Sequence, residues 1–520
     1  MTAEKTVHII ATSDTHGKMV PWNYEMDQED HSGSMAQLAA AIRELKDDNT
    51  LLVDAGDTIQ ANCADLFLDE AVHPMIQCMN TIGYDIWVTG NHDYDFGIEE
   101  VTKTIRTLNA KTLTGNVYYT DHSPLAPGYA VLEKNGVRIG LIGMTTPVIS
   151  EERRVQKDGL IITDPMEETE KLIRKLQPET DVLIGVFHMG FGHSINERDT
   201  SVLDMAKAFP EFDVIIGGHE HKIVEEHLEN GILIVENADQ AASLNLITLT
   251  FEEQDGNCSL VSKHGKTVLL KDYAPDAELM KAMEPYHRKA KEAVEACIGI
   301  LEGSALSEEA DGDIPEGAFH SNPLTNFLHE LLQYYSGAEI TAFFINDESS
   351  NIHPGPIKRS DTISVIKYPN RLCVLRMSGK QLKKYMEYSA GFFKCPSSEE
   401  EPITRLPDRK LFTLDIFGGL DYEINVSRPA GSRIRSLRKT DGTEIKALDS
   451  FTVAVTDFRA QHLLLPEDGL FQGEKRPEVV NMNVRPDLES LNEMIIDFIR
   501  NVKKGVLRPD PSLHWRVVRR

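Results

Sequence analysis

Long apolar runs are missing from this chain of 520 residues. No stretch approaches the ~20 apolar residues that a membrane-spanning helix needs. The one apolar run near the start, Val7–Ala11, leads directly into Asp14 and His16, which belong to a motif described below and could not be part of a cleaved leader. We therefore predict no membrane partner. As the sequence stands we expect a cytoplasmic protein, or an exported or cell-wall protein if a leader has been trimmed.

Cysteine pairs and basic residues are also scarce. The six cysteines include no CxxC pair, so free and mostly buried thiols are expected. Lys and Arg total 54 against 82 Asp and Glu, which gives a formal charge of −28. An acidic surface repels the phosphate backbone and argues against long nucleic acids as partners. A small anionic substrate stays compatible with this charge if bound cations invert the local field.

The first half of the chain alternates apolar strands with segments of helical period. Runs such as VLIGVF are apolar on both faces, as expected for a strand covered by helices on either side. Such alternation predicts α/β layers. The predicted strands are Val7–Thr12, Thr50–Val53, Tyr84–Thr89, Val137–Ile142, Asp181–Phe187, Asp213–Ile216 and Ile232–Val235. The predicted helices are Met35–Lys46, Pro165–Leu176 and Ser201–Phe209.

The second half has a different character. A charged amphipathic helix over Asp276–Ala296, kinked at Pro285, is predicted to connect two domains. After it come an apolar helix at Pro323–Tyr334 and several β-branched strands separated by turns, which indicates an α+β domain. The chain's end is expected to pack on that domain. We predict domains over residues 1–275 and 297–520, joined by a helix over 276–296.

Five short polar motifs follow strands of the first half, each at the carboxyl end of its strand. They are SDTHG, AGD, TGNHDYD, FHMG and GGHEH. Sites of open α/β sheets form at these strand ends, and Asp, Asn and His are ligands of borderline divalent metals. Each motif has a glycine that permits a sharp turn. A single motif of this kind is weak evidence, but five in this order predict a metal site.

These motifs in this order resemble the calcineurin-like metallophosphatase superfamily, and GNHDYDFG with the long second domain resembles its 5′-nucleotidase family. Segments such as IKYPNRLCVLRMSGKQLKKYMEYSAGFF, DIFGGLDYEINVSRPAGSRIRSL and FTVAVTDFRAQ are most similar to the 2′,3′-cyclic-nucleotide 2′-phosphodiesterase/3′-nucleotidase branch. The resemblance implies a four-layer sandwich of two β-sheets flanked by helices, followed by an α+β substrate-recognition domain. It also implies hydrolysis of a small-molecule nucleotide, and we expect the protein to be a monomer.

The resemblance implies a ligand set for two divalent metal ions. Asp57 would bridge them; Asp14, His16 and His221 would hold one ion, and Asn91, His188 and His219 the other. Two such cations can clamp the attacking and leaving oxygens of an in-line displacement and acidify a bridging water to hydroxide. Mixed His and carboxylate ligation suits Mn, Zn, Fe or Co better than Ca or Mg.

His92 is predicted to act on the substrate and not on a metal. It lies between Asn91 and a run of acids, where its imidazolium could stabilise developing charge and donate a proton to the leaving group. Asp95 resembles the residue that orients this ring in the family, and Asp93 is the alternative because both acids are close. The catalytic pair is therefore predicted as His92 and Asp95.

Two aromatic residues of the second half are predicted to stack on a nucleotide base. Phe417 and Phe458 occupy the family's stacking positions, with Phe412 as the alternative to Phe417 if the strand register differs. A phenylalanine on a strand more often belongs to the core. The chain departs from the family at Asn346, Asp347 and Asn351, where a Gly-rich stretch with Arg is usual, and at AQHLLLPEDG, which replaces a glycine cluster.

Three functions remain open from the sequence. The first is hydrolysis of nucleotide phosphoesters, as a 2′,3′-cyclic-nucleotide phosphodiesterase or a 3′- or 5′-nucleotidase. The second is a broader phosphoesterase acting on dinucleotides or sugar phosphates. The third, of another class, is a nucleotide-binding protein without turnover, which would have no need of His92 and its oriented acid.

Overall fold

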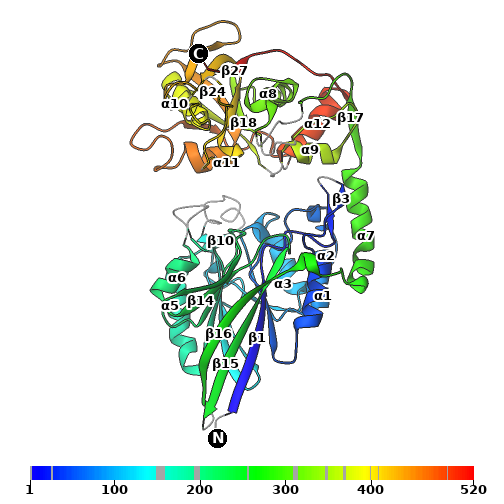
Figure 1. Ribbon diagram of the computed structural model, residues 1–520, viewed down its shortest axis with the longest axis vertical. Coiled ribbons are helices and arrows are strands. Elements are labelled where there is room, and N and C mark those ends of the chain that lie inside the picture. The colour runs from blue at the N-terminus through cyan, green and yellow to red at the C-terminus, as the bar shows by residue number, and fades with distance from the viewer. Residues whose placement is uncertain are drawn as a thin grey trace. The chain divides into compact units, whose positions relative to one another are not determined.

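The computed structural model describes residues 3–24, 27–147, 159–192, 200–254, 257–308, 314–345, 350–366, 370–396, 398, 400–407, 409–488 and 490–519. The chain forms two compact units, Met1–Lys291 and Glu292–Arg520 (Figure 1). Helix α7 (Ala277–Val294), with Pro285 inside it, crosses the boundary between them. Among the described helices, none is long and apolar enough to cross a membrane.

Two mixed six-stranded sheets form the first unit. Each has four neighbouring parallel strands; the first sheet adds two antiparallel strands at one edge, and the second adds one antiparallel strand at each edge. The first sheet has the order β16 (Asn257–Leu269), β15 (Ser243–Gln254), β1 (Ala3–Thr12), β4 (Thr50–Asp54), β5 (Ile86–Val88) and β6 (Lys111–Leu113). The second has the order β13 (Val224–Glu229), β14 (Ile232–Glu236), β12 (Val214–Ile216), β11 (Val182–His188), β9 (Val137–Thr145) and β8 (Tyr129–Lys134).

The core of this unit lies between the two sheets. One continuous apolar cluster joins Ile9 and Val53 of the first sheet to Ile139 and Ile184 of the second, and all four are fully buried. Helices cover the outer faces: α5 (Pro165–Leu176) and α6 (Val202–Ala208) pack on the second sheet, and α1 (Met35–Leu45), α2 (Pro74–Ile82) and α3 (Ile98–Thr107) lie on the other side (Figure 1). The result is the predicted four-layer arrangement of two sheets flanked by helices.

Local sequence accounts for where the helices begin. Ser34 caps α1 by accepting a hydrogen bond from the amide of Gln37, and Ser201 and Asp204 form a capping box at α6. Each of the seven predicted strands overlaps an observed one, and the three predicted helices are present. The long β15–β16 hairpin was not predicted, although the alternation of apolar and polar residues in β15 is typical of a strand.

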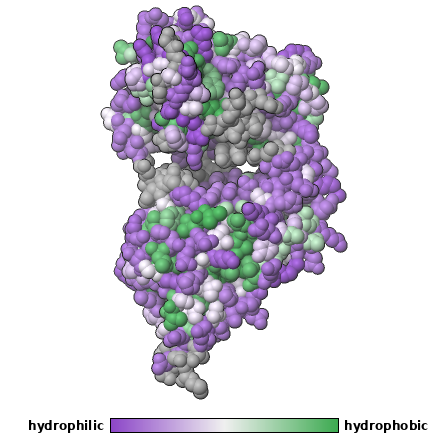
Figure 2. All heavy atoms as spheres, viewed as in Figure 1, coloured by the Kyte–Doolittle hydropathy of each residue, from purple (hydrophilic) through white to green (hydrophobic). Residues whose placement is uncertain are grey.

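The second unit is α+β, as predicted. Its central sheet has the order β21 (Asp415–Gly418), β18 (Ile340–Phe344), β24 (Ser450–Thr456), β20 (Leu372–Ser378) and β25 (Glu478–Asn481). Its longer helices are α8 (Pro323–Ser336) and α10 (Gly379–Ala390), with the shorter α9 (Arg359–Val365) and α12 (Leu491–Asp497). Near the chain's end, β27 (Trp515–Val518) pairs with β22 (Leu420–Asn425), so the tail packs on this unit as predicted. In the view of Figure 2 most of the surface is hydrophilic, consistent with the charged composition.

Candidate metal centre

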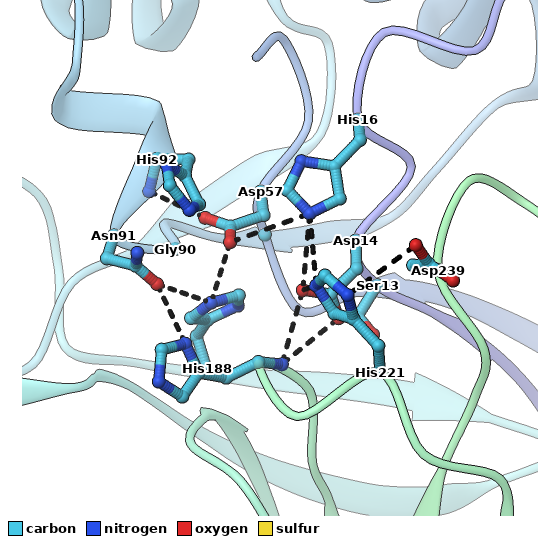
Figure 3. A network of polar contacts seen from close by, with 12 residues as sticks. Ser13, Asp14, His16, Asp57, Gly90, Asn91, His92, His188, His221 and Asp239 are labelled. Carbon is cyan, nitrogen blue, oxygen red and sulfur yellow. Dashed lines mark hydrogen bonds and ion pairs between the residues drawn. The ribbon is translucent and has the colours of Figure 1, made fainter. Parts of the chain in front are cut away.

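The five polar motifs converge at one edge of the first unit. Asp14 follows β1, Asp57 follows β4 and Asn91 follows β5, all from the first sheet. His188 ends β11 and His219 follows β12, both from the second sheet. The carboxyl ends of parallel strands meet at one edge of a sheet, and the two facing sheets bring both sets of loops together (Figure 3).

Asp14, His16 and His221 form one cluster of ligand atoms. His221 Nε2 lies 3.3 Å from Asp14 Oδ1 and 3.2 Å from His16 Nε2. These three residues can present one ligand atom each, all within 4.8 Å of one another. Because two imidazole nitrogens at 3.2 Å can share only one proton, a cation between them fits this cluster.

Asp57, His188 and His219 form the second cluster, and Asn91 joins it. His188 Nε2 is 3.1 Å from Asp57 Oδ2 and 3.0 Å from Asn91 Oδ1. Asn91 Oδ1 is also 2.9 Å from His219 Nδ1. Asp57 Oδ2 lies 4.0 Å from His16 Nε2 of the first cluster, so Asp57 faces both clusters (Figure 3). All seven predicted ligands are therefore brought together.

The donor set fits two divalent cations. His188 Nδ1 lies 2.8 Å from the Ala55 carbonyl and donates to it, so Nε2 is the nitrogen that faces Asp57 and Asn91 and would bind a cation after losing its proton. Asp57 Oδ2 is buried and accepts no hydrogen bond with good geometry from the described residues. A buried carboxylate oxygen among imidazole nitrogens is the arrangement that a transition metal satisfies.

The backbone of the site is strained. Asp14, His16, Asp57, His219 and His221 have positive φ, at 54°, 45°, 57°, 77° and 58°. Residues other than glycine adopt this left-handed conformation at a cost of order 1 kcal/mol or more, and such residues cluster at functional sites. Five of the seven predicted ligands share it, so the loops are shaped to direct these side chains inward.

Two glycines let the Asp57 and Asn91 loops approach closely. Gly56 has φ +101°, and a Cβ there would lie 2.3 Å from the amide nitrogen of Gly90. A Cβ on Gly90 would lie 2.2 Å from Asp57 Oδ1. A side chain at either position would force the Asp57 and Asn91 loops apart.

Asp93 ties the same two loops together. Its carboxylate accepts hydrogen bonds from the backbone amides of Asp57 at 2.9 Å, Thr58 at 3.0 Å and Gly90 at 2.8 Å. Burial and the nearby Asp57 charge raise the pKa of Asp93 to about 7. Its role is therefore to position ligands, which sequence reasoning missed because the motif places two acids within reach of His92.

Asp95 is the acid that contacts His92. His92 Nδ1 lies 2.8 Å from Asp95 Oδ2, and the His92 backbone amide donates to Asp57 Oδ1 at 2.8 Å. The His92 ring is partly exposed and packs edge-on against the His16 ring, with 5.6 Å between centroids. Because Nδ1 contacts Asp95, Nε2 is the ring nitrogen that would have to act on a substrate.

Electrostatics in the centre favour cations. Burial opposes ionisation of Asp14, but His221 and His188 outweigh it and hold the pKa of Asp14 below its usual value. Burial lowers the pKa of His188, but Asp57 and Asp14 raise it to about 10. Burial and the proximity of His188 lower the pKa of His219 to about 4. Two buried carboxylates thus remain charged and attract positive charge.

Asp239 is a second residue that the motifs did not indicate. Its Oδ2 lies 3.5 Å from His221 Nδ1, on the side of the ring away from Asp14 (Figure 3). A carboxylate behind a metal-ligating histidine fixes its tautomer and orientation. Asp239 lies in the loop after β14, at the carboxyl end of a parallel strand, and that position is the signal that could have identified it.

The predicted base-stacking residues of the second unit are not brought together. Phe417 is 2% exposed and packs against Tyr385, with 5.0 Å between centroids, so it is a core residue. Phe458 is half-buried and lies beside Phe412 instead, at 6.2 Å between centroids and 86° between ring planes. The alternative, Phe412, is therefore the ring that accompanies Phe458, because β21 begins only after residue 412 and places Phe417 inside.

Further side chains surround Phe458. Phe344 lies at 6.1 Å and His462, from the segment that replaces the family's glycines, at 4.8 Å between ring centroids. Arg459 pairs with buried Asp415 at 2.7 Å, and its guanidinium lies over the Phe344 ring at 5.2 Å. Asn346 and Asp347 lie outside the described residues. Asn351 is a structural residue, since its side chain bonds the backbone of Ser307 in both directions.

Comparison with known proteins agrees with this geometry. Residues 7–223 match the calcineurin-like phosphoesterase family, and residues 298–463 match the 5′-nucleotidase C-terminal domain. The trifunctional nucleotide phosphoesterase YfkN of Bacillus subtilis is 24% identical over 87% of this chain, which spans 35% of that protein. The 2′,3′-cyclic-nucleotide 2′-phosphodiesterase/3′-nucleotidase of Haemophilus influenzae is 22% identical over 98% of this chain and 87% of its own length.

A solved structure shares the fold of the whole chain. It is that of a Staphylococcus aureus protein classed provisionally as a 5′-nucleotidase, with a TM-score of 0.80 and 21% identity, covering 99% of this chain and 100% of that one. The phosphoesterase match falls within the first unit and the C-terminal-domain match within the second. Both ligand clusters lie in the first unit. The chain belongs to the calcineurin-like metallophosphoesterases that carry a 5′-nucleotidase C-terminal domain, and is a phosphoric ester hydrolase of the nucleotidase family.

Proposed function

We propose that this enzyme hydrolyses the phosphoesters of nucleotides, either the 2′,3′-cyclic diester or a 3′- or 5′-phosphomonoester. The observation that supports this most is the contact of His92 with both Asp95 and the Asp57 loop. An imidazole beside the two ligand clusters supports a proton-donor role for His92, in a chain whose second unit matches a nucleotidase domain.

Seven residues would hold the metal ions. Asp14, His16 and His221 would bind one ion and Asn91, His188 and His219 the other, with Asp57 shared. Bound there, Mn, Zn, Fe or Co would act as Lewis acids on the phosphoryl oxygens and lower the pKa of water. Asp239 and the Ala55 carbonyl keep His221 and His188 in the tautomer that a ligand needs.

His92 would serve the leaving group. During hydrolysis a water oxygen bonds to phosphorus as the bond from phosphorus to the ester oxygen breaks. That oxygen gains negative charge and takes a proton, which His92 Nε2 supplies while Asp95 stabilises the charged ring through Nδ1. In a 2′,3′-cyclic diester the leaving oxygen stays on the ribose, so the product is a monoester that the same site can hydrolyse again.

A substrate panel tests the proposal. The enzyme, loaded with Mn²⁺, would be given 5′-, 3′- and 2′,3′-cyclic nucleotides, and the products separated by chromatography. We expect turnover of at least one class well above that of the Asp57→Asn protein. If only dinucleotides or sugar phosphates were hydrolysed, the broader phosphoesterase would replace this proposal.

The base would stack on the aromatic cluster formed by Phe344, Phe412 and Phe458. Phe412 is 38% exposed, so one face of the cluster is open to a ligand. Arg459 holds two residues of the cluster in place, because it contacts the Phe344 ring and donates a hydrogen bond to the Phe412 carbonyl. Aromatic stacking is tolerant of base identity, which suits a nucleotidase that accepts several bases.

Replacing Phe458 by alanine should weaken nucleotide binding specifically. We expect KM for nucleotides to rise about tenfold, equivalent to about 1.4 kcal/mol of lost stacking. Hydrolysis of p-nitrophenyl phosphate should not change, because that substrate carries no base. Steady-state kinetics on both substrates would measure the contrast, and an equal loss on both would show that Phe458 is structural.

Phe417→Ala is the matched control for that variant. Because Phe417 is buried in the core, its truncation should lower the free energy of unfolding by about 3–5 kcal/mol. It should not discriminate between nucleotide and aryl phosphate. A selective rise of KM for nucleotides in Phe417→Ala would return the stacking role to Phe417.

A further inference from the structure

A cavity of about 240 Å³ lies in the second unit, beside α8 and the first residues of β18. Its walls come from α8, from the turn at Gly418 and Gly419, and from the segment that ends in Trp515. It is separate from the aromatic cluster. Thr341 lines the cavity, whereas Phe344 belongs to the cluster. Because these two residues are three positions apart on β18, their side chains point to opposite faces of the sheet.

Two buried polar atoms of the cavity wall have no hydrogen-bond partner among the described residues. They are the indole Nε1 of Trp515, a residue that is only 2% exposed, and the imidazole Nε2 of His329. Leaving a buried donor or acceptor unsatisfied costs about 1–3 kcal/mol. Each such group in a native fold needs an explanation, and a ligand in the adjoining cavity is one that a small movement of these side chains would allow.

The fold holds His329 rigidly in this position. Its Nδ1 lies 2.7 Å from Thr341 Oγ1, and its ring lies close to the backbone at Gly418. A Cβ at Gly418 would come within 2.4 Å of the His329 ring and 2.6 Å of Thr341 Oγ1. Only glycine leaves room for the imidazole there; Thr341 holds Nδ1, and Nε2 is the nitrogen without a partner among the described residues.

The charge of the cavity wall excludes anions. Glu330, Glu339 and Asp510 line it, whereas no Lys or Arg is among its lining residues in the described part of the chain. Lys503 and Lys439 pair with Glu330 and Glu339 from outside the wall. Burial and nearby His514 lower the pKa of His329 to about 3, so this ring is uncharged near neutral pH. A phosphate in the cavity would lie beside these carboxylates, and the two lysines that pair with Glu330 and Glu339 are not part of the wall.

We propose that this cavity binds an uncharged, polyhydroxylated molecule through its hydroxyl groups, with the ribose of a nucleoside as the source. Hydroxyls both donate and accept, so they can donate to the lining carboxylates and accept from Trp515 Nε1–H. The choice of a nucleoside rests on the proposed function, which releases nucleosides from nucleotides. The cavity would take the dephosphorylated product and reject the charged substrate.

The indole resonances of the three tryptophans provide a direct test. Trp515 lines the cavity, whereas Trp22 and Trp87 belong to the first unit and serve as internal references. The full chain, with ¹⁵N-labelled tryptophan and carrying Phe458→Ala to remove base stacking, would be titrated with adenosine. We expect a saturable shift of the Trp515 Nε1–H signal, assigned with Trp515→Phe, and unchanged signals of Trp22 and Trp87.

Two exposed threonines of one turn give a matched pair of variants. Thr440 lines the cavity and Thr443 does not, and both are exposed. Thr440→Trp should abolish the shift by filling the mouth, and Thr443→Trp should preserve it. A shift that persists in Thr440→Trp, or an unresponsive Trp515 at saturating adenosine, would overturn the proposal.

Further measurements distinguish a nucleoside from a free sugar as the ligand, and they test this site separately from the proposed function. An equal response to free ribose would keep the hydroxyl chemistry and assign the site to a sugar. Nucleotide hydrolysis without any response of Trp515 overturns this site alone. A response of Trp515 in a protein that hydrolyses no nucleotide keeps the site and overturns the proposed function.

Discussion

Asp57→Asn is expected to abolish hydrolysis and to lower the metal content of both clusters. The Asp57 carboxylate faces both, at 3.1 Å from His188 Nε2 and 4.0 Å from His16 Nε2. Metal-ion stabilisation of the transition state is worth several kcal/mol, so the rate should fall by about 10³-fold or more. Metal analysis of dialysed protein would show the loss independently of activity.

This substitution should leave the fold intact. Asn tolerates the positive φ of this position as well as Asp does, and its Oδ1 can still accept from the His92 amide. Asp54→Asn is the control: Asp54 is buried three residues earlier and accepts from Thr12 and Gly56. Burial raises the pKa of Asp54 to about 8, so a neutral amide should be tolerated and both metals retained. Two metals and near-normal turnover in Asp57→Asn would refute the shared role.

The architecture and the ligand set were accessible from sequence for one physical reason. Parallel strands buried on both faces give apolar runs, and their carboxyl ends meet at one edge, so polar residues after each run must come together. Asp14, Asp57, Asn91 and His188 all follow this rule. The left-handed backbone at five ligands could not be predicted from the sequence, because Asp and His adopt negative φ at most positions.

Residues that act through other residues were harder to identify. Asp93 and Asp95 differ by two positions in one motif, and only the three-dimensional path of the loop assigns one to backbone amides and the other to His92. Phe412 and Phe417 posed a similar problem. Both flank an apolar segment, and the start of β21 at Asp415 decides which ring is buried. Long-range packing sets that boundary, and local sequence does not.

His92→Asn is expected to retain both metals and to lower kcat by about 10²–10⁴-fold on nucleotides, the range for losing a general acid. Metal retention follows from the geometry, because the His92 side chain contacts Asp95 and its backbone amide, which the variant keeps, donates to Asp57. Asp95→Asn should produce a smaller loss with the same substrate pattern, since the ring would remain but lose its orienting carboxylate.

The leaving group distinguishes proton donation from charge stabilisation. A ribose hydroxyl is a poor leaving group and needs a proton, whereas nitrophenolate departs without one. If His92 Nε2 donates that proton, the loss of kcat in His92→Asn should be large on nucleotides and should shrink markedly on p-nitrophenyl phosphate. A plot of log kcat against leaving-group pKa should therefore be steeper for the variant than for the wild type. Parallel plots, displaced by an equal loss on every ester, would show that His92 only stabilises charge on the phosphoryl group.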